Sequence, residues 1–184
     1  EAGIVVIAHE GASLTNVDYD IEAFSNSGYG AFIMDNLAEA MGEEGLYTTI
    51  VADLTNGSHN EWADGGVKRA QEAYPNMTLL EAEPRVESHD NGDTAYNVAK
   101  ELFKKYPDLK GIMGTSSFDA PGIARAIEEL GLIDKAFTSG TGMPADNAEL
   151  LKSGVVKSLT LWDPAIAGKA MISLALKVLN GEQI

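Results

Sequence analysis

The chain has 184 residues, of which 28 are acidic and 13 are basic, so its formal net charge is −15. This excess of negative charge repels phosphate groups and anionic lipid headgroups, which excludes nucleic acids and acidic membrane surfaces as partners. Cysteine is absent, so disulfides, thiolate chemistry and cysteine-ligated metals are excluded as well.

Apolar runs with strand character alternate with helical patterns along the whole chain. Gly3 to Ala8 is almost continuously apolar and β-branched, which is typical of a strand covered on both faces. Residues 17–23 alternate between apolar and acidic side chains and predict a half-exposed edge strand. Further strands are predicted at residues 46–52, 77–82, 111–114, 136–139 and 155–161.

Helices are predicted between these strands from their caps and their apolar spacing. The first runs from a cap at Ser25 or Asn26 to Met41, with Phe32 expected on its buried side. In the last helix, Ile166 and its neighbours are expected to pack inward. Candidate caps of the later helices are Asp93, Asp119 or Ala120, and Asp163, which precedes Pro164.

This alternation predicts an α/β fold with a parallel sheet, because each helix returns the chain to the same end of the sheet. The polar segment after each predicted strand is termed a crest. The crests comprise residues 9–11, 53–60, 83–85, 115–117, 140–142 and 162–164. All of them are expected at the carboxyl ends of the strands, which is where open α/β sheets bind their ligands.

The crests offer short hydrogen-bonding side chains and one large aromatic ring. Such a set suits a polyhydroxylated small molecule, because each hydroxyl both donates and accepts while a ring covers the apolar face of a sugar. The chain contains no glycine-rich phosphate cradle, so a nucleotide is not indicated. The candidate ligand-binding residues are His9, Glu10, Ser58, His59, Asn60, Thr115, Ser116, Ser117, Thr141 and Trp162.

Structural roles remain open for each of these residues. A hydroxyl or amide side chain at a crest is equally suited to capping the helix that follows it. Trp162 is equally suited to a place in the core. His9 beside Glu10 could hold a metal, but the spacing of known metal motifs is absent and no metal or cofactor is expected. Ser116 and Ser117 lack the surroundings of a catalytic nucleophile.

Four segments together carry a family likeness, and these are Val5–Glu10, Asn60–Trp62, Tyr106–Ile112 leading into Thr115–Ser117, and Leu161–Pro164. In their order and spacing they resemble the type I periplasmic sugar-binding proteins of ABC transporters. Within that family, the chain is most similar to the branch that binds rhamnose and the furanosyl signal autoinducer-2. The resemblance covers essentially all 184 residues.

The resemblance implies two flavodoxin-like, doubly wound lobes that close around a ligand. Residues 1–24 would be the last strands of an amino-terminal lobe whose earlier part precedes this sequence. Residues 25–161 would be the whole carboxyl-terminal lobe, and residues 162–184 the helix that returns to the first lobe. The chain would cross between the lobes near residues 24–25 and 160–162.

The resemblance also assigns positions in the binding site. His9 or Glu10 falls where the family usually has an aspartate that binds the ligand. The segments 58–60 and 115–117 match crests that contact ligand. Thr141 falls at a position that is often aspartate, and Trp162 at one that is glutamine in ribose binders. A His-Glu pair at residues 9–10 and a threonine at residue 141 thus stand where the family usually has aspartate, and these two differences leave the identity of the sugar open.

The function expected from these observations is capture of a sugar or furanosyl signal, without chemistry, for an ABC permease in the membrane. The protein would then lie in the periplasm or, as a lipoprotein, on the outer face of the membrane. One alternative is the effector-binding domain of a transcription regulator. Another is an enzyme that uses His9, Glu10 or His59 as acid or base. Exposed apolar surface at residues 3–8 and after Pro164 predicts self-association.

Overall fold

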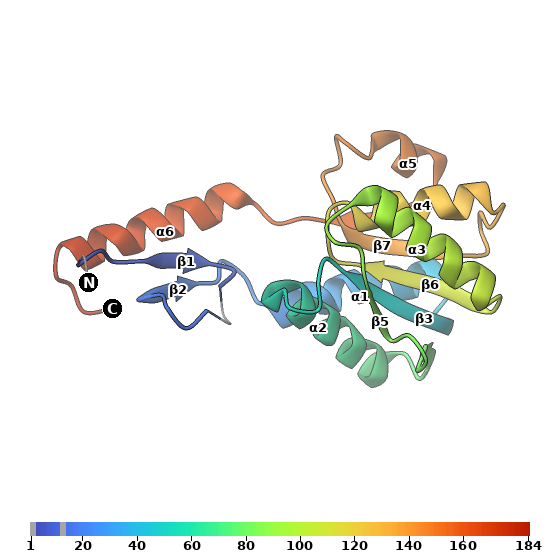
Figure 1. The fold of residues 1–184 in the computed structure, drawn as a ribbon, viewed down its shortest axis with the longest axis horizontal. Helices are drawn as coiled ribbons and strands as arrows, with labels where there is room; N and C mark the ends of the chain where they lie inside the picture. The colour runs from blue at the N-terminus through green and yellow to red at the C-terminus, as the bar shows by residue number, and fades with distance from the viewer. Residues whose placement is uncertain (1–2, 12–13) are drawn as a thin grey trace.

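The computed structural model describes residues 3–11 and 14–184 and consists of two separate bodies (Figure 1). The small body contains strands β1 (Ile7–His9) and β2 (Tyr19–Ile21) and helix α6 (Pro164–Leu179). All the other helices and strands form the large body. The chain passes between the two bodies twice, before α1 and again before α6.

The large body is built on a sheet in which every strand pair is parallel. The order along the sheet is β4-β3-β6-β7-β8, and β5 pairs with β3 beyond the end of β4. The strands are β3 (Glu44–Val51), β4 (Asn76–Leu79), β5 (Arg85–Glu87), β6 (Leu109–Gly114), β7 (Phe137–Thr141) and β8 (Ser158–Thr160). This confirms the predicted doubly wound α/β fold, and the winding direction reverses between β3 and β6.

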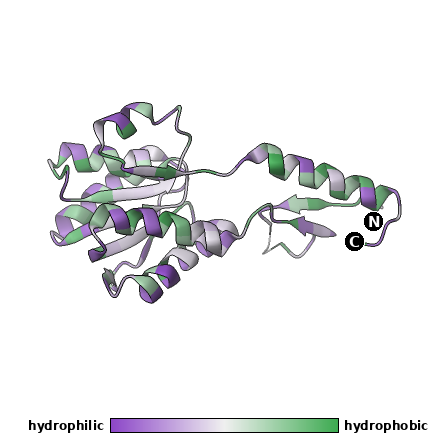
Figure 2. Ribbon diagram, turned by 180° about the vertical axis from the view of Figure 1, so that it is seen from behind, coloured by the Kyte–Doolittle hydropathy of each residue, from purple (hydrophilic) through white to green (hydrophobic). Residues whose placement is uncertain are grey.

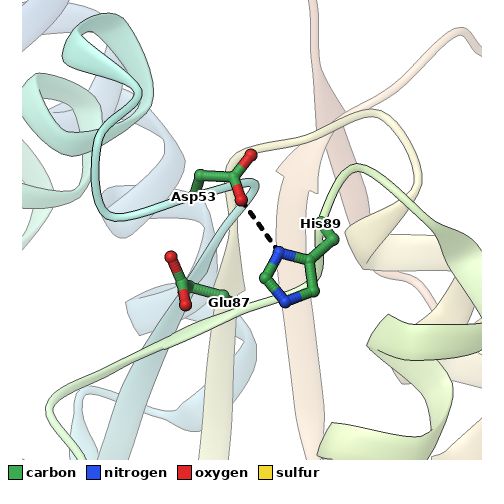
Figure 3. Close-up of side chains that lie close together, drawn as sticks. All are labelled: Asp53, Glu87 and His89. Atoms are coloured by element: carbon green, nitrogen blue, oxygen red, sulfur yellow. Dashed lines mark hydrogen bonds and ion pairs between the residues drawn. The ribbon is translucent and has the colours of Figure 1, made fainter.

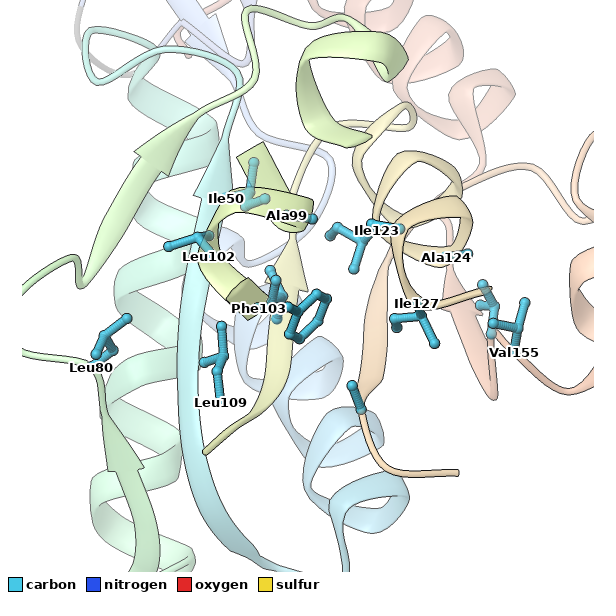
Figure 4. Close-up of a cluster of buried hydrophobic side chains, with 14 residues drawn as sticks. Ile50, Leu80, Ala99, Leu102, Phe103, Leu109, Ile123, Ala124, Ile127 and Val155 are labelled. Atoms are coloured by element: carbon cyan, nitrogen blue, oxygen red, sulfur yellow. The ribbon is translucent and has the colours of Figure 1, made fainter. Parts of the chain in front are cut away.

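Helices cover both faces of this sheet. Helix α1 (Asn26–Met41) packs closely against α2 (Gly57–Ala73) on one face, and α3 (Gly92–Lys105) packs against α4 (Asp119–Glu129) on the other. Helix α5 (Ala148–Ser153) leads into β8. Each face has its own core, and Figure 4 shows the one under α3 and α4, to which Phe103, Ile123 and Ile127 belong.

The caps follow the prediction in part. Ser25 caps α1 by accepting from the Gly28 N–H, and Asp163 caps α6 before Pro164, as expected. Helix α3 is capped by Asn91 rather than by Asp93, because the Asn91 side chain accepts from the N–H groups of residues 93 and 94. Neither Asp119 nor Ala120 caps α4, since both lie within the helix.

The third crest lies later in the chain than predicted. Strand β4 ends at Leu79, and the chain turns before Pro84 and pairs again with β3 as β5. Arg85 is therefore a strand residue, and the polar segment that follows this edge of the sheet is residues 88–91. Two residues of this segment, His89 and Asp90, have positive φ angles of 54° and 52°.

The small body exposes apolar surface, as predicted for residues 3–8 and for the helix after Pro164. Strand β1 has three residues and is shorter than predicted, and Ile4 in the segment before it is 74% exposed. Among the described residues, α6 is the element that packs on β1 and β2, so the strand is not covered on both faces. Ile166 of α6 and Phe32 of α1 are also exposed rather than buried. Figure 2 shows the resulting apolar segments on β1 and along α6. Among the described helices, none is both long and apolar enough to cross a membrane.

Candidate functional site

The carboxyl ends of the strands in the large body face the small body. Strand β8 ends at Thr160, directly before the segment that crosses to α6, and His9 at the end of β1 approaches from the other side. The ring centroids of His9 and Trp162 are 5.2 Å apart. The crests of the two bodies therefore meet at the crossing segments.

Aromatic rings form a continuous array across this junction. From His9, the array passes through Trp162 to Phe24, with ring centroids 5.4 Å apart, and then to Trp62 at 6.1 Å. His59 stacks on Trp62 at 5.0 Å. Three of the predicted residues, His9, Trp162 and His59, thus belong to one array. Sequence reasoning did not predict Phe24 as a member, although its place just before the Ser25 cap was a usable signal.

Tyr29 joins this array to the end of β7. Its ring lies 4.8 Å from that of Trp62, and its hydroxyl lies 3.1 Å from the Thr141 hydroxyl and donates to the Thr160 carbonyl at 3.1 Å. Burial raises the pKa of Tyr29 to about 12, so the phenol stays protonated. Thr141 is therefore held by a neighbouring side chain at the junction.

The first turn of α2 holds three predicted residues in different roles. Asn56 caps the helix, and its side-chain oxygen accepts from the Ser58 hydroxyl and from the His59 N–H. Asn60 donates to the carbonyls of residues 53 and 56 and accepts from Arg85 at 2.7 Å. Ser58 and Asn60 thus support the crest through hydrogen bonds within the protein.

His59 is positioned as a neutral hydrogen-bond donor. Its Nδ1 accepts from the Ala52 N–H at 3.3 Å, which leaves the proton on Nε2. Burial lowers the pKa of His59, although the negative charges of Asp90 and Asp53 oppose this. The imidazole is therefore uncharged at neutral pH and presents an N–H group.

The crest after β6 is organised by Asp119. One oxygen of its carboxylate accepts from the N–H groups of Thr115 at 2.9 Å and Ser116 at 2.8 Å. The Thr115 hydroxyl donates to the Ile50 carbonyl, and the Ser116 hydroxyl donates to the Asp90 carboxylate. Ser117 is exposed. Of the three predicted hydroxyls, two are thus engaged by neighbouring segments.

Asp119 is fully buried, so its charged form carries a desolvation cost. Burial raises its pKa to about 6, and the hydrogen bonds that it accepts offset this only in part. Its second oxygen has no hydrogen-bond partner in the described part of the chain. Sequence reasoning treated Asp119 as a possible helix cap and missed its role beneath the crest.

The crest after β1 also contains polar atoms without partners. His9 Nε2 and Glu10 Oε1 are buried and make no hydrogen bond within the described residues. Burial raises the pKa of Glu10, and its φ angle of 56° places it in the left-handed region that non-glycine residues rarely adopt. Buried polar groups normally have partners, so these atoms are suited to a bound molecule.

One cavity of about 440 Å³ lies beside the first crossing segment. It is lined by Glu22, Phe24, Ser25, Asn26, Ser27, Glu61, Asp64, Gly65 and Lys68. Phe24 is shared with the aromatic array, but none of the ten predicted site residues lines this cavity. The predicted residues instead lie along the crests on which the two bodies meet.

Several solved structures with the same fold hold a bound sugar. The chain superimposes on an Agrobacterium radiobacter solute-binding protein in complex with D-arabinose, with a TM-score of 0.85 and 24% identity, over 98% of this chain and 62% of that one. A Clostridium phytofermentans solute-binding protein with bound L-rhamnose gives a TM-score of 0.86 and 20% identity, over 97% of this chain and 56% of that one. An Agrobacterium vitis solute-binding protein bound to α-D-tagatopyranose gives a TM-score of 0.87 and 21% identity, over 100% of this chain and 63% of that one.

These similarities, at identities below 25%, establish the fold. The chain spans between half and two thirds of the length of these three proteins. A family model adds a match at the level of sequence. The model described as "Periplasmic binding protein domain" matches residues 1–183, which is nearly the whole chain. The chain therefore belongs to the periplasmic binding protein family.

Proposed function

We propose that this chain is part of the solute-binding component of an ABC transporter and that it binds a sugar between its two bodies. The observation that carries the proposal is the pair of buried polar atoms without partners at the junction, His9 Nε2 and Glu10 Oε1, among the described residues. A hydroxyl-rich ligand supplies partners for such atoms. The solved structures of similar fold hold sugars, which supports the same ligand class.

The binding residues are proposed from both bodies. His9 and Glu10 act from the small body, and His59, Ser116, Ser117 and Trp162 act from the large body and its crossing segment. Ser58, Asn60, Thr115 and Thr141 position the crests. The aromatic array covers the apolar face of the sugar ring, as aromatic side chains commonly do in binding sites. Binding involves no bond making or breaking, and the bodies close on the ligand by bending at the two crossing segments.

The charge of the crests favours a neutral sugar over a sugar acid or sugar phosphate. Glu10, Asp53 and Asp90 carry carboxylates at or next to the proposed binding residues. The one arginine nearby, Arg85, is already bound to Asn60 and Asp64. Anionic ligands would therefore meet repulsion without a cation to offset it. Rhamnose, ribose-like pentoses and the furanosyl signal autoinducer-2 are the proposed candidates.

The test is calorimetric titration of the full-length protein with neutral pentoses, deoxyhexoses and furanosyl signals, together with a uronic acid and a sugar phosphate. We expect saturable binding of at least one neutral compound and none of the anionic ones. Absence of binding to every neutral compound would refute the proposal. Tight binding of the sugar phosphate would refute the argument from charge.

Replacement of Trp162 by alanine is expected to weaken binding of the ligand found in this way by about two- to twelvefold, because an aromatic contact contributes about 0.5–1.5 kcal/mol beyond its buried area. The matched control is Phe32→Ala, which removes an exposed aromatic ring on α1 away from the crests. The control should bind as the wild type does. Equal binding by Trp162→Ala and wild type would remove Trp162 from the site.

We also propose that the chain associates with itself through the exposed face of α6. Ile172, Leu176 and Leu179 are 64%, 56% and 80% exposed, and they lie on one helix beside exposed residues before β1. Such apolar patches usually mark contact surfaces. As part of the proposed transport role, we also propose a permease as partner and a lipid anchor. A solute-binding component delivers its ligand to the permease at the outer face of the membrane.

For the double variant Ile172→Lys/Leu176→Lys, sedimentation velocity is expected to show a shift from oligomer to monomer, because two charges prevent burial of this face. Lys177→Glu changes the charge of the same helix away from the hollow that Ile172 and Leu176 line, and it should leave the oligomer intact. A wild-type chain that is monomeric at all concentrations would contradict the proposal.

A further inference from the structure

A group of three ionisable side chains lies at the edge of the sheet, outside the proposed sugar-binding residues. Asp53 follows β3, Glu87 ends β5, and His89 lies two residues beyond Glu87 (Figure 3). One carboxylate oxygen from each acid and one ring nitrogen of His89 all lie within 4.8 Å of one another. This group is termed the DEH cluster.

The pairing of β3 and β5 explains why these residues meet. Val51 is opposite Glu87 in the parallel register, and the Ala52 carbonyl then accepts from the His89 N–H at 2.8 Å. Strand β5 ends at Glu87, and the chain then turns, with His89 in the left-handed region at a φ angle of 54°. This turn places the His89 ring beside Glu87. Asp53 follows the neighbouring strand β3, and Figure 3 shows its carboxylate directed at the imidazole.

The surrounding protein holds the Glu87 side chain and the Asp53 backbone in place. Glu87 Oε1 accepts from the Leu54 N–H at 2.7 Å. The backbone of Asp53 is fixed by its carbonyl, which accepts from the Asn56 N–H and from the Asn60 side chain, both at 3.0 Å. The donor atoms are thus arranged in advance, which lowers the entropic cost of binding an ion.

The charge of the DEH cluster is not balanced within the protein. Two carboxylates face one imidazole, and His89 is paired with Asp53 at 2.8 Å. Glu87 forms no ion pair with a lysine, arginine or histidine within residues 3–11 and 14–184. The hydrogen bond to Asp53 raises the pKa of His89, so a bound metal ion displaces the proton of the ring. With the neutral imidazole the cluster carries two negative charges, and a divalent cation would offset both.

We propose that the DEH cluster binds a divalent first-row transition metal such as Zn²⁺ through His89 and the carboxylates of Asp53 and Glu87. Imidazole with carboxylate oxygens suits Zn²⁺ and its neighbours, whereas Ca²⁺ and Mg²⁺ prefer oxygen ligands alone. Three protein ligands leave positions for water. The side chains of His89 and Asp53 are 63% and 47% exposed, so an ion can enter from solvent.

Binding would join the crest after β3 to the segment after β5. These segments carry His59 and Asp90, respectively, next to the proposed sugar site. The metal would therefore act by fixing the edge of the sheet and not by contact with the sugar. The inference does not depend on sugar binding, since it concerns different side chains and a different ligand.

The experiment is calorimetric titration of the full-length protein with ZnCl₂, repeated with CaCl₂. We expect one saturable Zn²⁺ site and much weaker Ca²⁺ binding. His89→Ala and Glu87→Gln should each weaken Zn²⁺ binding by more than about tenfold, the lower end of the loss when even a supporting partner of a metal ligand is removed. The amide introduced by Glu87→Gln retains an oxygen that can accept from the Leu54 N–H, so this variant tests charge rather than folding.

The matched control is Glu81→Gln, which removes an exposed carboxylate outside the cluster and should not change Zn²⁺ affinity. A second readout is the NMR signal of the three histidine rings, in which Zn²⁺ should shift His89 and leave His9 and His59 in place. Lack of Zn²⁺ binding by the wild type, or equal affinity in His89→Ala, would overturn the proposal. Loss of sugar binding alone would leave it standing.

Discussion

Replacement of Gly30 by alanine is expected to destabilise the protein strongly, although alanine is the better helix former. A methyl group at this position would lie 1.8 Å from the Trp62 carbonyl oxygen and 2.8 Å from the Trp62 Cα. These are backbone atoms of α2, so relief requires a shift of the whole helix. Overpacking of this kind costs about 1–3 kcal/mol and occasionally more, and we expect a value at the upper end of that range.

The matched control is Gly168→Ala in α6, where an added methyl group meets no atom within 4 Å. Both glycines lie inside long helices, so both substitutions gain the same helix propensity of about 0.8–1.0 kcal/mol. The control should therefore be slightly more stable than the wild type in urea unfolding followed by circular dichroism. A Gly30→Ala variant that is stabilised to the same extent would show that α1 and α2 are not in close contact.

The sequence was sufficient to predict the order of elements and the parallel sheet. Hydrophobic runs and the helices between them carry this information, because each crossover restricts the next strand to the parallel direction. The break between β4 and β5 was missed, since the apolar run at residues 77–82 continues past the end of β4. Pro84 could have indicated the break, because a proline cannot donate to a neighbouring strand.

The site residues were predicted less completely than the fold. Crest positions follow from strand ends, but the role of each side chain depends on contacts between distant segments. Asn60 illustrates this, because its amide is engaged by Arg85, which is 25 residues away. The DEH cluster depends on the pairing of Val51 with Glu87, and this register is not encoded in any local pattern. Burial of Asp119 likewise arises from packing of the crest above it.

Exposure of the small body was predicted from the sequence, but the length of its first strand was not. The run from Gly3 to Ala8 has the composition of a fully covered strand, and Ile4 is nevertheless 74% exposed. A sequence pattern reports which surface requires burial but not which element supplies the cover. The exposure predicted for residues 3–8 is therefore confirmed, while the strand is shorter than predicted, since β1 is Ile7–His9 and residues 3–6 lie outside it.

Asp119→Asn is expected to gain stability relative to the wild type as the pH rises from about 4 to about 6. Burial raises the pKa of Asp119 in the folded protein to about 6, above its ordinary value of 3.8. Between these values the folded state holds the proton more tightly than the unfolded state, so wild-type stability falls as the pH rises. Asparagine does not titrate and loses nothing over this range.

The difference in unfolding free energy between variant and wild type should therefore grow by about 1.4 kcal/mol for each unit of the pKa shift and stay constant above pH 7. Urea unfolding at a series of pH values measures this difference directly. Asparagine keeps an oxygen for the N–H groups of Thr115 and Ser116, so any loss from its buried amide is the same at every pH.

Asp108→Asn is the matched control, because Asp108 is an exposed carboxylate and its replacement should produce a difference that does not change with pH. A flat profile for Asp119→Asn would mean that the Asp119 carboxyl group is solvated in the folded protein. Because the same carboxylate holds the backbone of the crest after β6, that result would also require a different arrangement of Thr115 and Ser116. The pH profile thus tests the geometry of the crest without the ligand being known.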